Sequence, residues 1–154
     1  MSKIIVLAEH MNGSVVKMSL NAIGAAKQLA AQVGGDFDIA IVGHGVASAA
    51  SQLTGYGATQ IFQVEDPAFE GYTAQAYAQG FHQAVEASGA SFVISASTAR
   101  GKDCIPRVAA RLDAGMASDV VGIEGDDDDI VDVRPMWSGN IIGRVKINTD
   151  IQVL

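Results

Sequence analysis

Short, continuously apolar runs alternate along the first two thirds of the chain with longer stretches of helical spacing. The continuous runs predict strands that are covered on both faces, because such strands carry apolar residues on both sides. The longer stretches predict helices that end at glycine-containing turns. The predicted strands are residues 4–8, 38–43, 60–65 and 92–96, and the predicted helices are 22–33, 46–57, 72–88 and 105–115. This alternation predicts an α/β fold with a Rossmann-like parallel sheet flanked by helices.

The pattern changes after Ser118, where apolar runs are separated by turn residues alone. Such short connections predict an antiparallel strand extension at the C-terminal end, because parallel neighbours need a long crossover. The predicted strands are residues 118–124, 129–137, 140–147 and 150–154. The run Asp126 to Asp129 is interpreted as a solvated hairpin turn, since it lacks the alternation of a calcium loop. The length of 154 residues fits one domain, 1–154.

Composition narrows the class of protein. The chain is 49% hydrophobic and carries a net charge of -7, which argues against general nucleic-acid binding. No apolar run approaches the ~20 residues of a membrane span. The first residues already read as a strand, which leaves no room for a signal or transit segment. A single cysteine fits a reducing compartment. We therefore expect a cytoplasmic protein with no membrane span.

Residues 96–103, ASTARGKD, resemble a phosphate-binding loop but depart from it at two positions. Ala96 replaces the first glycine, and Asp103 replaces the hydroxyl residue that would hold magnesium. We expect Asp103 to cap the following helix, with Pro106 in its first turn. The free amides of that helix start still make Thr98, Gly101 and Lys102 weak candidates for an anion site.

Other chemistry-bearing residues form no recognisable centre. The glycine-rich stretch 42–48 lacks the third glycine of a dinucleotide motif, so a structural turn is favoured. The histidines His10, His44 and His82 do not combine with Cys104 at any metal-binding or nucleophilic spacing. Cys104 is interpreted as a small residue facing the core, although an early helical position can also lower a thiol pKa. No catalytic residue and no metal ligand is predicted.

Two strings resemble a known family. GKDCIPRVAARLD at 101–113 and RPMWSGN at 134–140, together with the opening IIVLAEHMNGSV, closely resemble the N-terminal domain of electron-transfer flavoprotein alpha subunits. The resemblance covers essentially the whole chain. It implies a non-catalytic scaffold and interaction domain, in a heterodimer that carries electrons from flavoprotein dehydrogenases to a quinone reductase. The chain ends inside an apolar strand, IQVL, where the family continues into an FAD-binding domain.

The resemblance also implies where the cofactors lie. FAD is expected in the full-length protein and not on this chain alone, and AMP is expected in the beta subunit. The implied partners are the beta subunit and the protein's own FAD domain. Two other functions stay open: a stand-alone adenine-nucleotide-binding module of universal-stress type, and a small thiol enzyme that uses Cys104.

The distribution of arginine indicates a partner surface, since all five arginines lie at or after position 100. The interface candidates are Arg107 and Arg111, four residues apart on the predicted fourth helix, and Arg134 and Trp137 in the antiparallel extension. Val108 and Leu112 are expected to turn toward the sheet. The alternative is that Trp137 belongs to the core and Arg134 caps the sheet edge.

Overall fold

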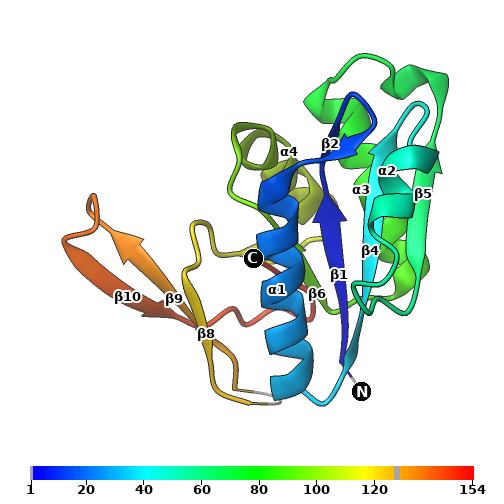
Figure 1. The fold of residues 1–154 in the computed structure, drawn as a ribbon. Coiled ribbons are helices and arrows are strands. Elements are labelled where there is room, and N and C mark those ends of the chain that lie inside the picture. Colours follow the sequence, from blue (N-terminus) through cyan, green and yellow to red (C-terminus); the bar gives the residue numbers. More distant parts are fainter. Residues whose placement is uncertain (1, 127–128) are drawn as a thin grey trace.

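The structure is a computed structural model that describes residues 2–126 and 129–154. Within those residues, six parallel strands form the central sheet in the order β5-β4-β1-β6-β11-β7 (Figure 1). Their bounds are β1 (Lys3–Ala8), β4 (Asp36–Gly43), β5 (Ile61–Glu65), β6 (Phe92–Ser95), β7 (Gly115–Met116) and β11 (Gln152–Val153). The predicted α/β class and its parallel sheet are confirmed.

Helices cover both faces of this sheet because its strands are apolar on both sides. Ile4 and Val6 of β1 pack toward α1 and α2, whereas Ile5 and Leu7 pack toward α3 and α4. The helices are α1 (Lys17–Gln32), α2 (Ala47–Gln52), α3 (Ala74–Ser88) and α4 (Ala99–Arg111). Two hydrophobic cores result, one on each face, as a doubly wound sheet requires.

Four short elements carry too weak a pattern to be predicted from sequence. They are the hairpin β2 (His10–Met11) with β3 (Ser14–Val15), the 3-10 turn η1 (Pro67–Phe69), and the two-residue strand β7. Each spans only two or three residues, so it contains no full period of apolar spacing.

A separate three-stranded antiparallel sheet follows the parallel core, in the order β10-β9-β8. Its strands are β8 (Gly122–Glu124), β9 (Val131–Met136) and β10 (Ile141–Val145). Figure 1 shows the β9–β10 hairpin projecting away from the helices and the central sheet, and β8 at its base. We call residues 131–145 the arm. The predicted turn at Asp126 to Asp129 includes residues 127–128, which lie outside the described residues.

One strand of the extension was predicted with the wrong direction. Residues 150–154 were expected to be antiparallel, but β11 lies parallel to its neighbours, between β6 and β7 of the central sheet. The turn before β11 returns the chain to the sheet instead of folding a hairpin. Thr149 fixes this return, because its hydroxyl accepts a hydrogen bond from the Gly115 amide at 2.8 Å and donates one to the Ile151 carbonyl at 2.6 Å.

Candidate functional site

The carboxyl ends of β1 and β6 mark the place where a doubly wound sheet usually binds a ligand. Within the sheet, β4 lies next to β1 on one side, and β6, which comes later in the chain, lies next to β1 on the other side. The two loops therefore separate above this point and leave a crevice. Glu9 follows β1, and Thr98 follows β6 at the start of α4. The loop of residues 96–103, which resembles a phosphate-binding loop, lies at this crevice.

The helix α4 begins at Ala99, earlier than predicted, and Thr98 is its cap. The extended backbone of Thr98 lets its hydroxyl accept a hydrogen bond from the Gly101 amide at 2.8 Å. The expectation that Asp103 caps this helix is wrong, because Asp103 lies inside it. Pro106 is likewise inside the helix and not in its first turn, so the helix loses one backbone hydrogen bond there.

All three weak anion-site candidates have partners within the chain. The Thr98 hydroxyl donates a short hydrogen bond to the Glu9 carboxylate, and the Gly101 amide bonds Thr98. The Lys102 ammonium lies 2.7 Å from an Asp119 carboxylate oxygen. A Cβ on Gly101 would stand 2.2 Å from the Ala96 carbonyl oxygen, so the glycine is required by backbone contact. A carboxylate of the protein thus lies where a helix start would attract an external anion.

Aromatic and charged side chains fill the rest of the crevice. The Arg100 guanidinium lies 4.6 Å from the centre of the Tyr72 ring and donates to the His10 carbonyl at 3.3 Å. The Tyr72 hydroxyl donates to Asp103 at 2.9 Å. Burial, together with this carboxylate, raises the pKa of Tyr72. The cavity left beside Glu9, His10 and Arg100 measures about 10 Å³, which is room for about one water.

The thiol and the histidines do not form a reactive centre in the described part of the chain. Cys104 is buried on the core face of α4, and burial raises its pKa to about 12, which opposes thiolate chemistry. The His10 ring lies against Val42, with Nε2 at 3.0 Å from its carbonyl oxygen. No three side chains of His, Cys, Asp or Glu within residues 2–126 and 129–154 are placed to hold a metal ion.

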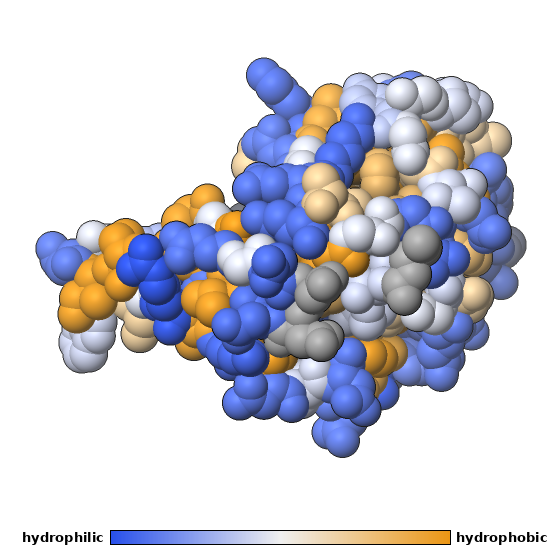
Figure 2. Space-filling model, turned by 90° about the horizontal axis from the view of Figure 1, so that it is seen from below, coloured by the Kyte–Doolittle hydropathy of each residue, from blue (hydrophilic) through white to orange (hydrophobic). Residues whose placement is uncertain are grey.

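The tip of the arm exposes apolar side chains to solvent. Trp137 is 77% exposed, which excludes the alternative that it belongs to the core. Trp137 and Ser138 both adopt positive φ angles, 51° and 54°, which non-glycine residues rarely do. The strands leading to this turn expose Met136, Ile141 and Ile142 as well. Figure 2 shows apolar surface along the projecting hairpin.

Both faces of the arm's tip, residues 135–142, are apolar. Met136 is opposite Ile141 across the ladder, so their side chains lie on one face. Pro135 is opposite Ile142 on the other face. An antiparallel sheet normally buries one face and exposes a polar one. The exposure of residues 136, 141 and 142 was not predicted from the sequence. The sequence did contain a signal for it, because apolar residues occupy both alternating positions of these strands and no helix follows that could cover them.

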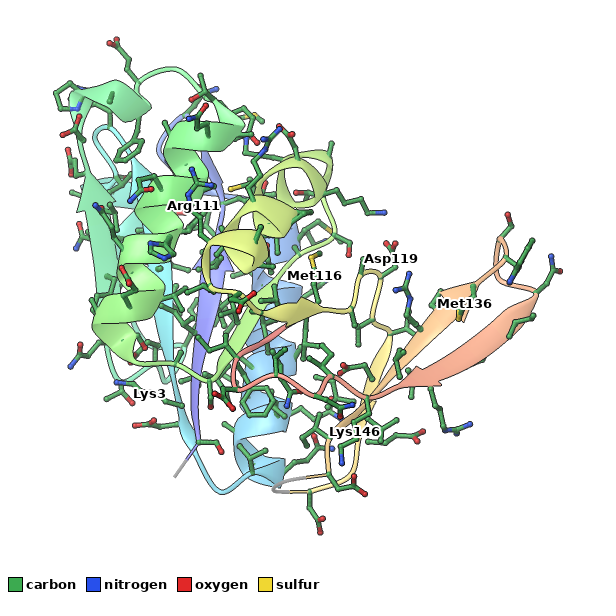
Figure 3. The ribbon with its side chains drawn as sticks, turned by 180° about the vertical axis from the view of Figure 1, so that it is seen from behind. Lys3, Arg111, Met116, Asp119, Met136 and Lys146 are labelled. Carbon is green, nitrogen blue, oxygen red and sulfur yellow. The ribbon has the colours of Figure 1, made fainter. Side chains whose placement is uncertain are left out.

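The two basic candidates on α4 lie on its outer face, as predicted. Arg107 and Arg111 are exposed, while Val108 is buried and Leu112 packs against the same core cluster. Arg107 is engaged with Asp103, at 3.2 Å from its carbonyl oxygen and 3.7 Å from its carboxylate. Arg111 donates to Gln79 at 3.3 Å. Figure 3 shows Arg111 on the helical side of the molecule, away from Met136 on the arm.

Arg134 lies within β9, opposite Gly143 of β10. Its guanidinium donates to the Ser118 hydroxyl at 3.1 Å. The structure therefore brings Arg134 and Trp137 together on one element and leaves the α4 arginines on another. In the described residues, no helix is long and apolar enough to cross a membrane.

Comparisons with known proteins identify the family of this chain. A model described as "Electron transfer flavoprotein domain" matches residues 4–154. The chain is 35% identical over 150 residues to "Electron transfer flavoprotein subunit alpha" of Bacillus subtilis, covering 96% of this chain and 45% of the relative. It is 28% identical over 154 residues to the protein of the same name from Pseudomonas aeruginosa, covering 98% and 46%.

A third relative carries another name. The chain is 28% identical over 143 residues to "Lactate dehydrogenase (NAD(+),ferredoxin) subunit LctC" of Acetobacterium woodii, covering 92% of this chain and 34% of the relative. The chain thus spans less than half the length of these curated relatives. The match over almost every residue shows that this chain belongs to the electron transfer flavoprotein family, on the side of its alpha subunits.

Proposed function

We propose that this chain is a non-catalytic interaction domain of a heterodimeric electron-transfer flavoprotein. Its task is to support the flavin-bearing part of the alpha subunit and to bind the beta subunit. In that assembly FAD carries the electrons, which arrive from flavoprotein dehydrogenases and leave to a quinone reductase, and AMP is held by the beta subunit. Family membership and the curated relatives support the electron-transfer role.

The observation that carries the interaction role is the uncovered tip of the arm. Trp137, Ile142 and Ile141 are 77%, 57% and 52% exposed, respectively. Exposed apolar groups gathered on one projection mark an interaction site, and tryptophan is enriched among the residues that dominate binding energy. Because both faces of the tip are apolar, one flat contact would leave half of the tip in water. We therefore expect the arm to lie in a groove of the beta subunit or between that subunit and the FAD domain.

The charged groups around the arm are paired with one another, which favours an apolar protein surface as the partner over a charged ligand. Arg144 makes two hydrogen bonds to Glu124, at 3.0 and 3.3 Å, and Lys146 lies 2.6 Å from Asp129. These pairs neutralise the cations beside the arm's base, while residues 135–142 carry no charge at all. An uncharged apolar tip suits the desolvated centre of a protein interface, whose core is depleted of charged residues.

The alternative function, a stand-alone adenine-nucleotide-binding module, has less support. Its phosphate would need the start of α4, where Glu9 already receives the Thr98 hydroxyl. Phosphate beside a carboxylate is disfavoured by repulsion between like charges. The exposed arm also has no role in such a module.

The test is assembly of the alpha subunit that carries this domain with its beta subunit. We expect Trp137→Ala to weaken the affinity at least tenfold, a loss of about 1.4 kcal/mol or more. Met11→Ala is the matched control, since Met11 is also apolar and 59% exposed, but lies on the β2–β3 hairpin. Affinity is measured by calorimetry, and FAD retention by the flavin spectrum.

The α4 face is tested separately with Arg107→Glu and Arg111→Glu. Each arginine lies on the outer surface, so the variants should fold. A tenfold loss of affinity in either would extend the interface to α4. If Trp137→Ala and both arginine variants bind the beta subunit and keep FAD like the unchanged protein, the proposed interaction surface is wrong.

A further inference from the structure

The base of the arm contains a buried carboxyl group without a partner. Asp132 lies in the middle strand of the antiparallel sheet and is 0% exposed. In the part of the chain that the structure describes, neither of its carboxylate oxygens accepts a hydrogen bond. A buried ionised carboxylate without a partner is strongly unfavourable. This position therefore favours the protonated form of Asp132.

The residues directly opposite Asp132 offer it no compensating charge. Ile123 of β8 and Val145 of β10 are opposite it across the two ladders. On those strands, Glu124 and Arg144 are one position away and bond each other on the opposite face. From α1, the Gln32 amide donates to the carbonyl of Ile123, the residue opposite Asp132 on β8, at 3.1 Å.

The remaining charged groups near this joint lie on β9 itself, in the loop before β8 and beside the ends of β9 and β10. Arg134 shares the face of Asp132, two positions along β9, but its guanidinium donates to Ser118, and its buried Nε has no partner in the described residues. Beyond it, Asp119 pairs with Lys102. Lys146 pairs with Asp129. Figure 3 shows Asp119 and Lys146 on the two sides of the region where the arm leaves the central sheet.

Burial without a hydrogen-bond partner makes ionisation of the Asp132 carboxyl less favourable. It raises the pKa of the carboxyl from its ordinary value of 3.8 to about 6. A carboxyl whose pKa is raised by folding stabilises the seated base fully below pH 3.8. That stabilisation is lost progressively as the pH rises to about 6, above which both the seated and the opened forms are ionised.

We propose that Asp132 is a proton-controlled joint that sets how firmly the base of the arm is seated on the α1 side of the core. When Asp132 is neutral, the base packs as an apolar layer with the buried Ile123 and Ile130. When Asp132 is ionised, its charge favours water or the guanidinium of Arg134, and the base opens more readily. This inference rests on the proposed function, because it concerns the regulation of the arm assigned there to partner binding.

The experiment is hydrogen exchange of the β8 and β9 amides in this chain between pH 4 and pH 8, corrected for intrinsic exchange. The comparison is Asp132→Asn, which keeps the shape and stays neutral at every pH. Relative to that variant, opening in the unchanged chain should rise about tenfold per pH unit between pH 4 and 6 and then level off, about a hundredfold higher in all. Amides of β1 should show no such difference.

Two further measurements keep the inference decisive. Asp150→Asn, at an exposed aspartate, should leave the pH dependence of β9 unchanged. If Asp132→Asn fails to fold, the carboxyl of the unchanged chain is titrated by NMR, and a midpoint near 4 refutes the joint. Parallel exchange in the chain and in Asp132→Asn at every pH would also refute it. Neither readout uses the beta subunit, so a failed assembly test refutes only the proposed interface.

Discussion

At the scale of single residues, buried charge is tolerated in this protein where it has partners. Asp38 is 0% exposed, yet its carboxylate lies 3.0 Å from the Lys3 ammonium. It also accepts hydrogen bonds from the Ser88 hydroxyl at 2.8 Å and the Gln60 amide at 3.1 Å. These contacts tie β4 to β1, α3 and the start of β5. Asp132, with no such contacts, is the contrasting case.

We expect Asp38→Ala to lower the free energy of unfolding by about 2–4 kcal/mol, because it leaves a hydroxyl, an amide and an ammonium without their acceptor. Urea denaturation followed by far-UV circular dichroism measures the change. Asp36→Ala is the control: Asp36 is exposed and bonds only the exposed Thr59 at 3.1 Å among the described contacts, so its loss should stay below about 1 kcal/mol. Equal losses in the two variants would contradict a special role of burial.

At the scale of elements, the start of α4 shows what the sequence could and could not predict. The helix itself was evident from Val108 and Leu112, which repeat at helical spacing. Its first residue was not, because Thr98 and Asp103 are both common capping residues. The choice depends on Glu9, which is 89 positions away from Thr98 in the sequence. No local pattern reports such a contact.

The capping role of Thr98 gives a prediction for α4. Thr98→Ala should lower the free energy of unfolding by about 1–2 kcal/mol, since the Gly101 amide loses its acceptor and Glu9 loses its donor. Thr98→Ser keeps the hydroxyl and should stay within about 0.5 kcal/mol of the unchanged chain. Urea unfolding midpoints compare the three proteins. If the serine variant is as unstable as the alanine variant, the methyl group and not the hydroxyl is what α4 requires.

At the scale of the whole molecule, the parallel sheet was predictable and the path of its last strand was not. Buried strands are recognisable in the sequence as continuous apolar runs, such as Ile4 to Ala8. The position of β11 depends on whether a turn folds a hairpin or returns the chain to a distant sheet. That choice is made by Thr149 and its contact with Gly115, a tertiary contact with no signature in spacing. The arm's uncovered faces likewise depend on which helices happen to be near.

The filled crevice leads to a prediction about nucleotide binding by the whole chain. We expect AMP to bind with a dissociation constant above about 1 mM, less favourable than about -4 kcal/mol, because Glu9 and Arg100 already occupy the space at the carboxyl ends of the strands. Calorimetry on the isolated chain measures this, and the beta subunit serves as the positive control. A micromolar constant would favour the nucleotide-binding module instead.

The position of Trp137 determines what tryptophan fluorescence can report about this protein. It is the single tryptophan of the chain, and it lies at the tip of a projection, 77% exposed. Its fluorescence emission is therefore that of an indole in water even in the native state. Unfolding of the central sheet would leave that emission almost unchanged, so an experimenter who follows it would see no folding transition at all. The same indole would shift to shorter wavelength when another surface covers it, which makes it a built-in sensor of docking.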